Sequence, residues 1–135
     1  MQFLLDTSTC VYFLRGVLNF DSILREKGVE NCFISEITVF ELKYGAENSS
    51  NPKTSRKAVD NFINGLTVLP IFSIVDEYAK TKVELRQKGT PMHDEFDLMI
   101  GVTARHNKLT LVTDNVKDFR FINGITIENW YNRKY

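Results

Sequence analysis

The stretch MQFLLDTST occupies residues 1–9 and decides how the rest of the chain is interpreted. Its apolar run predicts a buried strand at 3–5, and Asp6 follows that strand directly. The polar residues after Asp6 predict a helix over 7–15 that a threonine or serine caps. A carboxylate between a strand and a helix either caps the helix or belongs to a site at the edge of a sheet.

Short apolar runs and amphipathic stretches alternate along the chain. The runs predict strands at 32–34, 67–69, 110–113 and 125–127. The amphipathic stretches predict helices at 19–27, after Ser35, and at 53–64, 73–88 and 95–107. Strands that alternate with helices predict an α/β fold with a parallel sheet, and ligand sites in such folds lie at the carboxyl ends of the strands.

Length and composition predict one globular domain over residues 1–135, since the chain is 43% hydrophobic. The 17 basic and 17 acidic residues cancel, so nucleic acid would have to bind a local basic patch. Cys10 and Cys32 are expected to be buried thiols in a reduced cytoplasmic protein. We expect neither a signal peptide nor a membrane span, because the most apolar stretch is interrupted by Pro70 and Ser73.

Carboxylates recur at predicted strand ends and on predicted inward helix faces: Asp6, Glu41, Asp97 and the pair Asp114 and Asp118. Each has an ordinary alternative, namely a helix cap, a buried ion pair, a favourable contact with the helix dipole, a turn and a surface charge. Their number favours one shared anionic pocket, and like charges gathered in a partly dry site require protonation or a cation.

The helix after Ser35 carries the most informative of these acids. Glu41 shares a face with Ile37, Phe40 and Tyr44, and this face is expected to be buried. In the later helix, Asp97 shares a side with the small residues Gly101 and Ala104, which allow close approach of another element or of a substrate.

The residue types indicate the chemistry of such a pocket. Oxygen ligands without histidine or cysteine suit Mg²⁺ or Mn²⁺, which keep water ligands and bind substrate phosphates. A metal of this kind acidifies water for in-line attack on phosphorus. The other candidates for catalysis are weaker. His93 is typical of a solvated loop residue, and His106 interacts favourably with the dipole at the end of its helix. Ser8 lacks the strand-turn-helix motif that surrounds a nucleophilic serine.

Several segments together resemble the PIN-domain ribonucleases, in particular the VapC toxins of bacterial toxin–antitoxin modules. These segments are residues 4–8, 34–46, 96–101, 111–119 and 127–130. They span nearly the whole chain in the family's order. The acidic stretch His93-Asp94-Glu95 and Gly101-Val102-Thr103 depart from the usual pattern.

The resemblance implies an α/β/α sandwich around a mainly parallel sheet and an endoribonuclease that depends on Mg²⁺ or Mn²⁺. Asp6, Glu41 and Asp97 match its metal-site positions, while Asp114 and Asp118 both match the fourth. Thr113 and Asn115 then position water or phosphate. Lys43 and Arg86 are expected to grip the RNA backbone, since phosphate contacts need no sequence information.

The same resemblance implies a VapB-like antitoxin that covers the acid cleft, with an RNA substrate such as tRNA or rRNA and a homodimer as the expected assembly. A PIN fold that only binds protein, without catalysis, is the alternative, and metal binding distinguishes the two. A phosphoaspartate enzyme of the haloacid dehalogenase kind is disfavoured, because the second aspartate it needs is Ser8 here.

Overall fold

The computed structural model describes residues 1–17 and 19–131. The strands are β1 (Phe3–Leu5), β2 (Cys32–Ser35), β3 (Thr67–Leu69), β4 (Thr110–Val112) and β5 (Ile127–Glu128). They form one sheet in the order β3-β2-β1-β4-β5, and each neighbouring pair is parallel. The predicted strands are therefore confirmed, except that the last one lies at Ile127–Glu128 instead of 125–127, and β1 occupies the centre.

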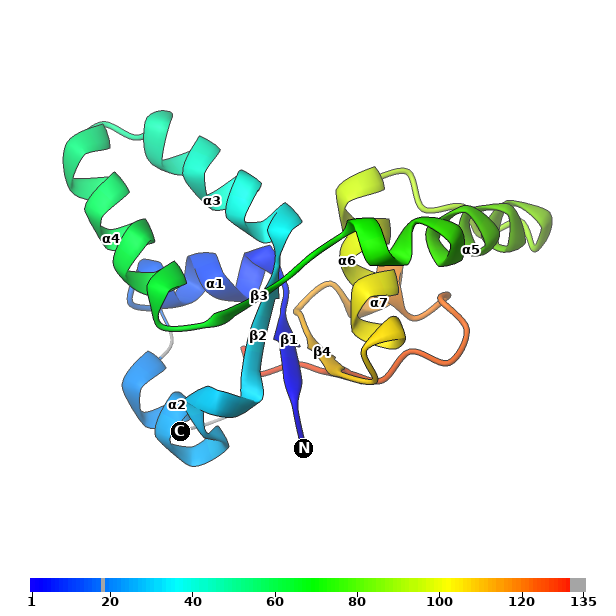
Figure 1. Ribbon diagram of the computed structural model, residues 1–135, viewed down its shortest axis with the longest axis horizontal. Helices are drawn as coiled ribbons and strands as arrows, with labels where there is room; N and C mark the ends of the chain where they lie inside the picture. The colour runs from blue at the N-terminus through cyan, green and yellow to red at the C-terminus, as the bar shows by residue number, and fades with distance from the viewer. Residues whose placement is uncertain (18, 132–135) are drawn as a thin grey trace.

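Helices cover both faces of this sheet, with α1 to α4 on one side and α5 to α7 on the other (Figure 1). The first side holds α1 (Thr7–Leu14), α2 (Phe20–Lys27), α3 (Glu36–Glu47) and α4 (Pro52–Asn64). The second side holds α5 (Val75–Gln87), α6 (Glu95–His106) and α7 (Val116–Phe119). Short 3-10 turns span Val29–Asn31 and Phe72–Ile74. The predicted α/β/α sandwich is confirmed.

The core consists of two apolar clusters, one on each face of the sheet. Phe3 and Leu5 pack into the cluster beneath α1 to α4, whereas Leu4 between them packs into the cluster beneath α5 to α7. Successive strand residues point to opposite faces, so a strand covered on both sides must be apolar throughout. Phe3, Leu4 and Leu5 are all buried for this reason.

Local capping signals place the site residues. The Ser35 hydroxyl accepts a hydrogen bond from the Ile37 N–H at 3.0 Å and begins α3, as predicted. The cap of α1 is Asp6 instead of a threonine or serine, because its carboxylate accepts from the Thr7 N–H at 2.8 Å. In this chain a carboxylate at the end of β1 therefore both caps the next helix and faces the edge of the sheet.

The predicted buried face of α3 is wrong in part. Ile37 is buried, but Phe40 is 65% exposed and Tyr44 is 71% exposed. The buried residues of α3 are Ile37, Thr38, Leu42 and Ala46. Neighbouring helices cover this adjacent stripe, which leaves Glu41 half-buried at its margin.

Gly101 shows which of two predicted neighbours approaches it. A Cβ at this position would lie 2.5 Å from Ile122 Cδ1 and 3.1 Å from Phe119 Cδ1. Because Gly101 has no side chain, α7 and the segment after it can pack closely against α6.

Cys10 and Cys32 are buried and form no disulfide, as predicted. Within residues 1–17 and 19–131, no helix is long and apolar enough to span a membrane.

Candidate active site

Asp6 is fixed at the carboxyl end of the central strand and is only 4% exposed. Besides the Thr7 N–H, its carboxylate accepts hydrogen bonds from the hydroxyls of Thr113 at 2.7 Å and Ser8 at 3.3 Å. Burial raises the pKa of Asp6 above its usual range, and these hydrogen bonds act in the opposite direction. The fold therefore holds this carboxylate in place from β1, α1 and the end of β4 together.

Glu41 reaches the same edge from α3. Its Oε1 accepts a hydrogen bond from the Thr7 hydroxyl at 2.7 Å, and that hydroxyl also lies 3.0 Å from the Thr38 hydroxyl. Thr7 follows Asp6 in the chain, so one threonine links the orientation of Glu41 to the turn that holds Asp6. The Thr7 and Thr38 hydroxyls and the Glu41 carboxylate thus connect α3 to the turn after β1.

Asp97 lies in the first turn of α6 and is half-buried. Its N–H donates to the Asp94 carboxylate at 3.1 Å, which caps the helix. Burial raises the pKa of Asp97 to about 7, and the charges of Asp6, Asp94, Glu41 and Asp118 add to the rise. A carboxylate that is only partly ionised at neutral pH indicates a site where negative charge is crowded.

The three acids Asp6, Glu41 and Asp97 line one cleft of about 380 Å³. The chain thus brings together side chains from a strand end and two helices that are far apart in sequence. Among the described residues, no group of three or more acidic, histidine or cysteine side chains is arranged to hold a metal ion. The carboxylates face a shared space as an open set.

The segment after β4 contributes differently from the sequence expectation. Asn115 lines the cleft, and its N–H donates to the Thr113 hydroxyl at 3.0 Å. Asp114 instead accepts a hydrogen bond from the Tyr12 hydroxyl. Asp118 lines a neighbouring cavity of about 410 Å³, which shares Asp97 with the cleft. The residue of this segment that lines the cleft is therefore Asn115, and neither Asp114 nor Asp118 is among the lining residues.

The basic residues expected to bind RNA lie away from the cleft. Lys43 pairs with Asp60 at 3.1 Å on the surface of α3 and α4. Arg86 lines a separate groove on α5 that also contains Lys82, which is itself paired with Glu95. Arg15, which no local motif distinguishes, is the basic residue among the cleft-lining side chains.

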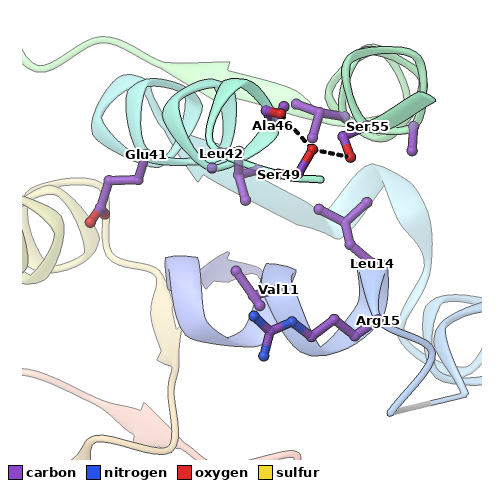
Figure 2. Close-up of a pocket in the computed structure, with 11 residues that line it drawn as sticks. Val11, Leu14, Arg15, Glu41, Leu42, Ala46, Ser49 and Ser55 are labelled. Atoms are coloured by element: carbon purple, nitrogen blue, oxygen red, sulfur yellow. Dashed lines mark hydrogen bonds between the residues drawn. The ribbon is translucent and has the colours of Figure 1, made fainter. Parts of the chain in front are cut away.

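An apolar groove of about 300 Å³ adjoins the cleft between α1, α3 and α4. Figure 2 shows Val11 and Leu14 of α1 facing Leu42 and Ala46 of α3 across this groove, with Glu41 at one end. Val11, Arg15 and Glu41 line both the groove and the cleft. An apolar surface therefore leads directly to the acids.

Neither histidine is among the residues that line the cleft. His93 is exposed and lines the neighbouring cavity that also contains Asp118, while the Nδ1 of His106 lies 2.9 Å from Oε1 of Glu77 at the end of α6. Phe13 is 7% exposed and packs in the core, and Phe62 packs against the same cluster.

Comparisons with known proteins place this geometry in a family. A model of the PIN domain matches residues 3–123. The chain belongs to the PIN domain family. Within it the chain is similar to the VapC proteins, including the tRNA(fMet)-specific endonuclease VapC of Salmonella typhimurium, with 36% identity over 96% of this chain and 98% of that protein.

A second PIN-domain relative is ribonuclease VapC2 of Haemophilus influenzae, which is 31% identical over 96% of this chain and 98% of its own length. The solved DNA-bound VapBC complex from Salmonella typhimurium contains a chain that superposes with a TM-score of 0.89 at 34% identity. That match covers 96% of this chain and 98% of the other. The resemblance to VapC proteins is therefore confirmed over almost the full length.

Proposed function

We propose that this PIN-domain chain is an endoribonuclease toxin of the VapBC type, which hydrolyses RNA phosphodiester bonds in the acid cleft. The observation that carries the proposal is the convergence of Asp6, Glu41 and Asp97 on one cleft, with the pKa of Asp97 raised to about 7 by burial and by its acidic neighbours. The VapC relatives support the choice of RNA, since their names describe ribonucleases.

A divalent cation, Mg²⁺ or Mn²⁺, fits the donor set. The cleft offers carboxylate oxygens and the amide of Asn115 without cysteine or histidine, and hard cations prefer such oxygens. Mg²⁺ usually binds one or two carboxylates and completes its shell with water and substrate phosphate, so an open set of acids suits it. When bound, the ion would supply charge neutralisation and a more acidic water.

Asp6 and Asp97 would hold this ion, and Glu41, which Thr7 orients, would act as a further ligand or accept a hydrogen bond from the attacking water. Thr113 keeps Asp6 in place through its hydroxyl. Arg15 at the cleft wall is placed to bind an RNA phosphate, which the carboxylates alone would repel.

The substrate and partner follow from the relatives. We propose tRNA(fMet) as the first substrate to test, because the Salmonella relative is named for it. A VapB-like antitoxin is the proposed partner, and the apolar groove beside the acids would take an apolar segment with a basic side chain directed at Glu41. Homodimer formation and a single domain over residues 1–135 stay predictions.

The decisive experiment compares the wild type with Asp97→Asn and Glu41→Gln on a tRNA(fMet) transcript in the presence of Mn²⁺. We expect each variant to lose cleavage by at least about a hundredfold, because removing one group that stabilises transition-state charge costs this much. Asp76→Asn is the matched control, since Asp76 is an exposed aspartate in the first turn of α5. It should stay within about twofold of the wild type.

Two outcomes would contradict the proposal. Cleavage by Asp97→Asn at the wild-type rate would show that the acid cleft is not the site where RNA is cleaved. A wild type that neither cleaves RNA nor binds Mn²⁺ in calorimetry would favour the alternative, a PIN fold that serves only to bind protein.

A further inference from the structure

One wall of the acid cleft is an aromatic side chain that the fold holds on two sides. Tyr12 on α1 lines the cleft and is half-buried. Its ring stacks on Tyr131 with a centroid distance of 4.5 Å and an interplanar angle of 23°. Its hydroxyl donates to Oδ2 of Asp114. The ring and the hydroxyl are therefore both restrained before any substrate arrives.

The three residues that follow β4 each hold a different part of the cleft. Thr113 donates to Asp6, Asp114 accepts from Tyr12, and Asn115 lines the cleft itself. The Asp114 carboxylate is thus committed to a tyrosine of α1. A carboxylate in that position orients a side chain of the cleft wall and does not face the space between the acids.

From this placement we propose that Tyr12 contacts the RNA in the cleft, and that Asp114 is a positioning residue that acts through Tyr12 instead of binding the metal. The inference rests on the proposed ribonuclease function and names a substrate-binding residue for it. It replaces the metal-ligand role that the sequence suggested for Asp114.

Chemistry supports a nucleotide as the group that Tyr12 meets. Proteins bind unpaired nucleotides largely by stacking or packing bases against aromatic side chains, and this contact tolerates any base. Hydrogen bonding to Asp114 raises the pKa of Tyr12 to about 12, so the phenol stays protonated at neutral pH. Because its O–H donates a hydrogen bond to Asp114, the phenolic oxygen is left to accept a hydrogen bond, for example from a ribose 2′-hydroxyl.

Arg15 extends the same surface. It is the C-cap residue of α1, three residues after Tyr12, which places both on one side of the helix, and both line the cleft. An aromatic ring next to a guanidinium offers one contact for a base or ribose and one for a phosphate. Asp6, Glu41 and Asp97 line the same cleft, so a nucleotide held by Tyr12 and Arg15 would lie beside them.

The first experiment measures the Mn²⁺ affinity of the RNA-free protein by calorimetry in the wild type, Asp114→Asn, Tyr12→Phe and Asp97→Asn. If Asp114 acts through Tyr12, Asp114→Asn and Tyr12→Phe should bind Mn²⁺ within about twofold of the wild type. Asp97→Asn should weaken binding by about tenfold or more, because it removes a proposed ligand charge. Weakening of similar size in Asp114→Asn would overturn the positioning role.

The second experiment measures the affinity for a tRNA(fMet) transcript on an Asp97→Asn background, where cleavage does not interfere. We expect Tyr12→Ala to weaken binding about tenfold, the size of one lost base contact. Tyr12→Phe and Asp114→Asn should each weaken it about threefold or more, and the double variant should be no worse than either single one. Removal of a negative charge alone would strengthen RNA binding. Weaker binding by Asp114→Asn would therefore indicate that Tyr12 is no longer held in the position that contacts RNA.

A matched tyrosine–carboxylate pair outside the cleft serves as the control. The Tyr78 hydroxyl donates to Glu95, and Tyr78 lines the groove on α5. Tyr78→Phe should leave the affinity for RNA within about twofold of the parent. Thermal unfolding of every variant checks that the fold is intact.

The outcomes separate this inference from the proposed function. Equal RNA affinity in the parent and in Tyr12→Ala would overturn the contact with Tyr12 and leave the ribonuclease proposal standing. Failure of the parent to bind tRNA(fMet) would count against the proposed substrate. In that case the Mn²⁺ measurements on Asp114→Asn would still decide between positioning and metal binding.

Discussion

Two aspartates of the same cleft are held in opposite ways. Asp6 at the end of β1 is 4% exposed and accepts hydrogen bonds from one N–H and two hydroxyls. Asp97 at the start of α6 is half-buried and lies among like charges, which with burial raise its pKa to about 7. One carboxylate is therefore built into the fold, and the state of the other depends on pH and on any cation present.

The largest expected difference is in stability without metal. Asp6→Ala should lower the free energy of unfolding by about 1 to 3 kcal/mol, because it removes a helix cap and leaves buried donors without an acceptor. Asp97→Ala should raise it slightly at pH 8, by less than about 1 kcal/mol, because a repelled and partly solvated charge is removed. Urea unfolding in the presence of EDTA measures both, and destabilisation of equal size in the two variants would contradict the distinction.

A smaller effect is expected from the residue that holds Asp6 from the other side. Thr113→Val removes the 2.7 Å hydrogen bond to Asp6 and the acceptor for the Asn115 N–H. We expect a loss of about 1 to 2 kcal/mol in unfolding free energy. Thr113→Ser keeps the hydroxyl and is the control, so it should recover most of the stability in the same urea titration. If valine and serine behaved alike, the hydroxyl would not be what holds Asp6.

Asp97 should make the stability of the metal-free protein depend on pH. Its pKa is about 7 in the folded state and near the ordinary value of 3.8 for an aspartate when unfolded. Between these values the folded protein binds more protons than the unfolded chain, so stability should fall as the pH rises from about 4 to 7. Thermal unfolding across this range should show the fall in the wild type, and a smaller one in Asp97→Asn.

Added cation should oppose this loss. Mn²⁺ that binds only the folded protein stabilises it by mass action, and it favours the ionised form of Asp97. The gain in melting temperature on adding Mn²⁺ should therefore be larger at pH 8 than at pH 5.5. A gain independent of pH would show that Asp97 does not take part in metal binding.

Local sequence signals predicted the parts of this site that local interactions determine. The apolar strand before Asp6 and the cap at Ser35 require only neighbours in sequence, and both were predicted correctly. Phe40 and Tyr44 were placed on a buried face wrongly, because helical spacing shows which residues share a face and not which face is covered. Packing of α3 against other helices decides that.

The contribution of the segment after β4 depended on contacts between distant residues. The Asp114 carboxylate accepts a hydrogen bond from Tyr12, a residue 102 positions away, and only the pairing of β1 with β4 brings the two together. Asn115, which the family resemblance singled out together with Thr113, is the residue of this segment that lines the cleft. Arg15 is the C-cap residue of α1 and belongs to no motif, so its place at the cleft wall emerged only with the arrangement of α1 and α3.

The smallest expected effect concerns the weakest contact of Asp6. The Ser8 hydroxyl lies 3.3 Å from Oδ2, whereas the Thr113 hydroxyl lies 2.7 Å from the same atom. Hydrogen bonds weaken as the donor–acceptor distance grows, so Ser8→Ala should cost less than about 0.5 kcal/mol in the urea titration. Because Thr113 and the Thr7 N–H continue to hold the carboxylate, RNA cleavage by Ser8→Ala should stay within about threefold of the wild type. A larger loss of cleavage in Ser8→Ala, with its stability unchanged, would mean that Ser8 has a separate role toward the substrate, since its bond to Asp6 is too long to account for it.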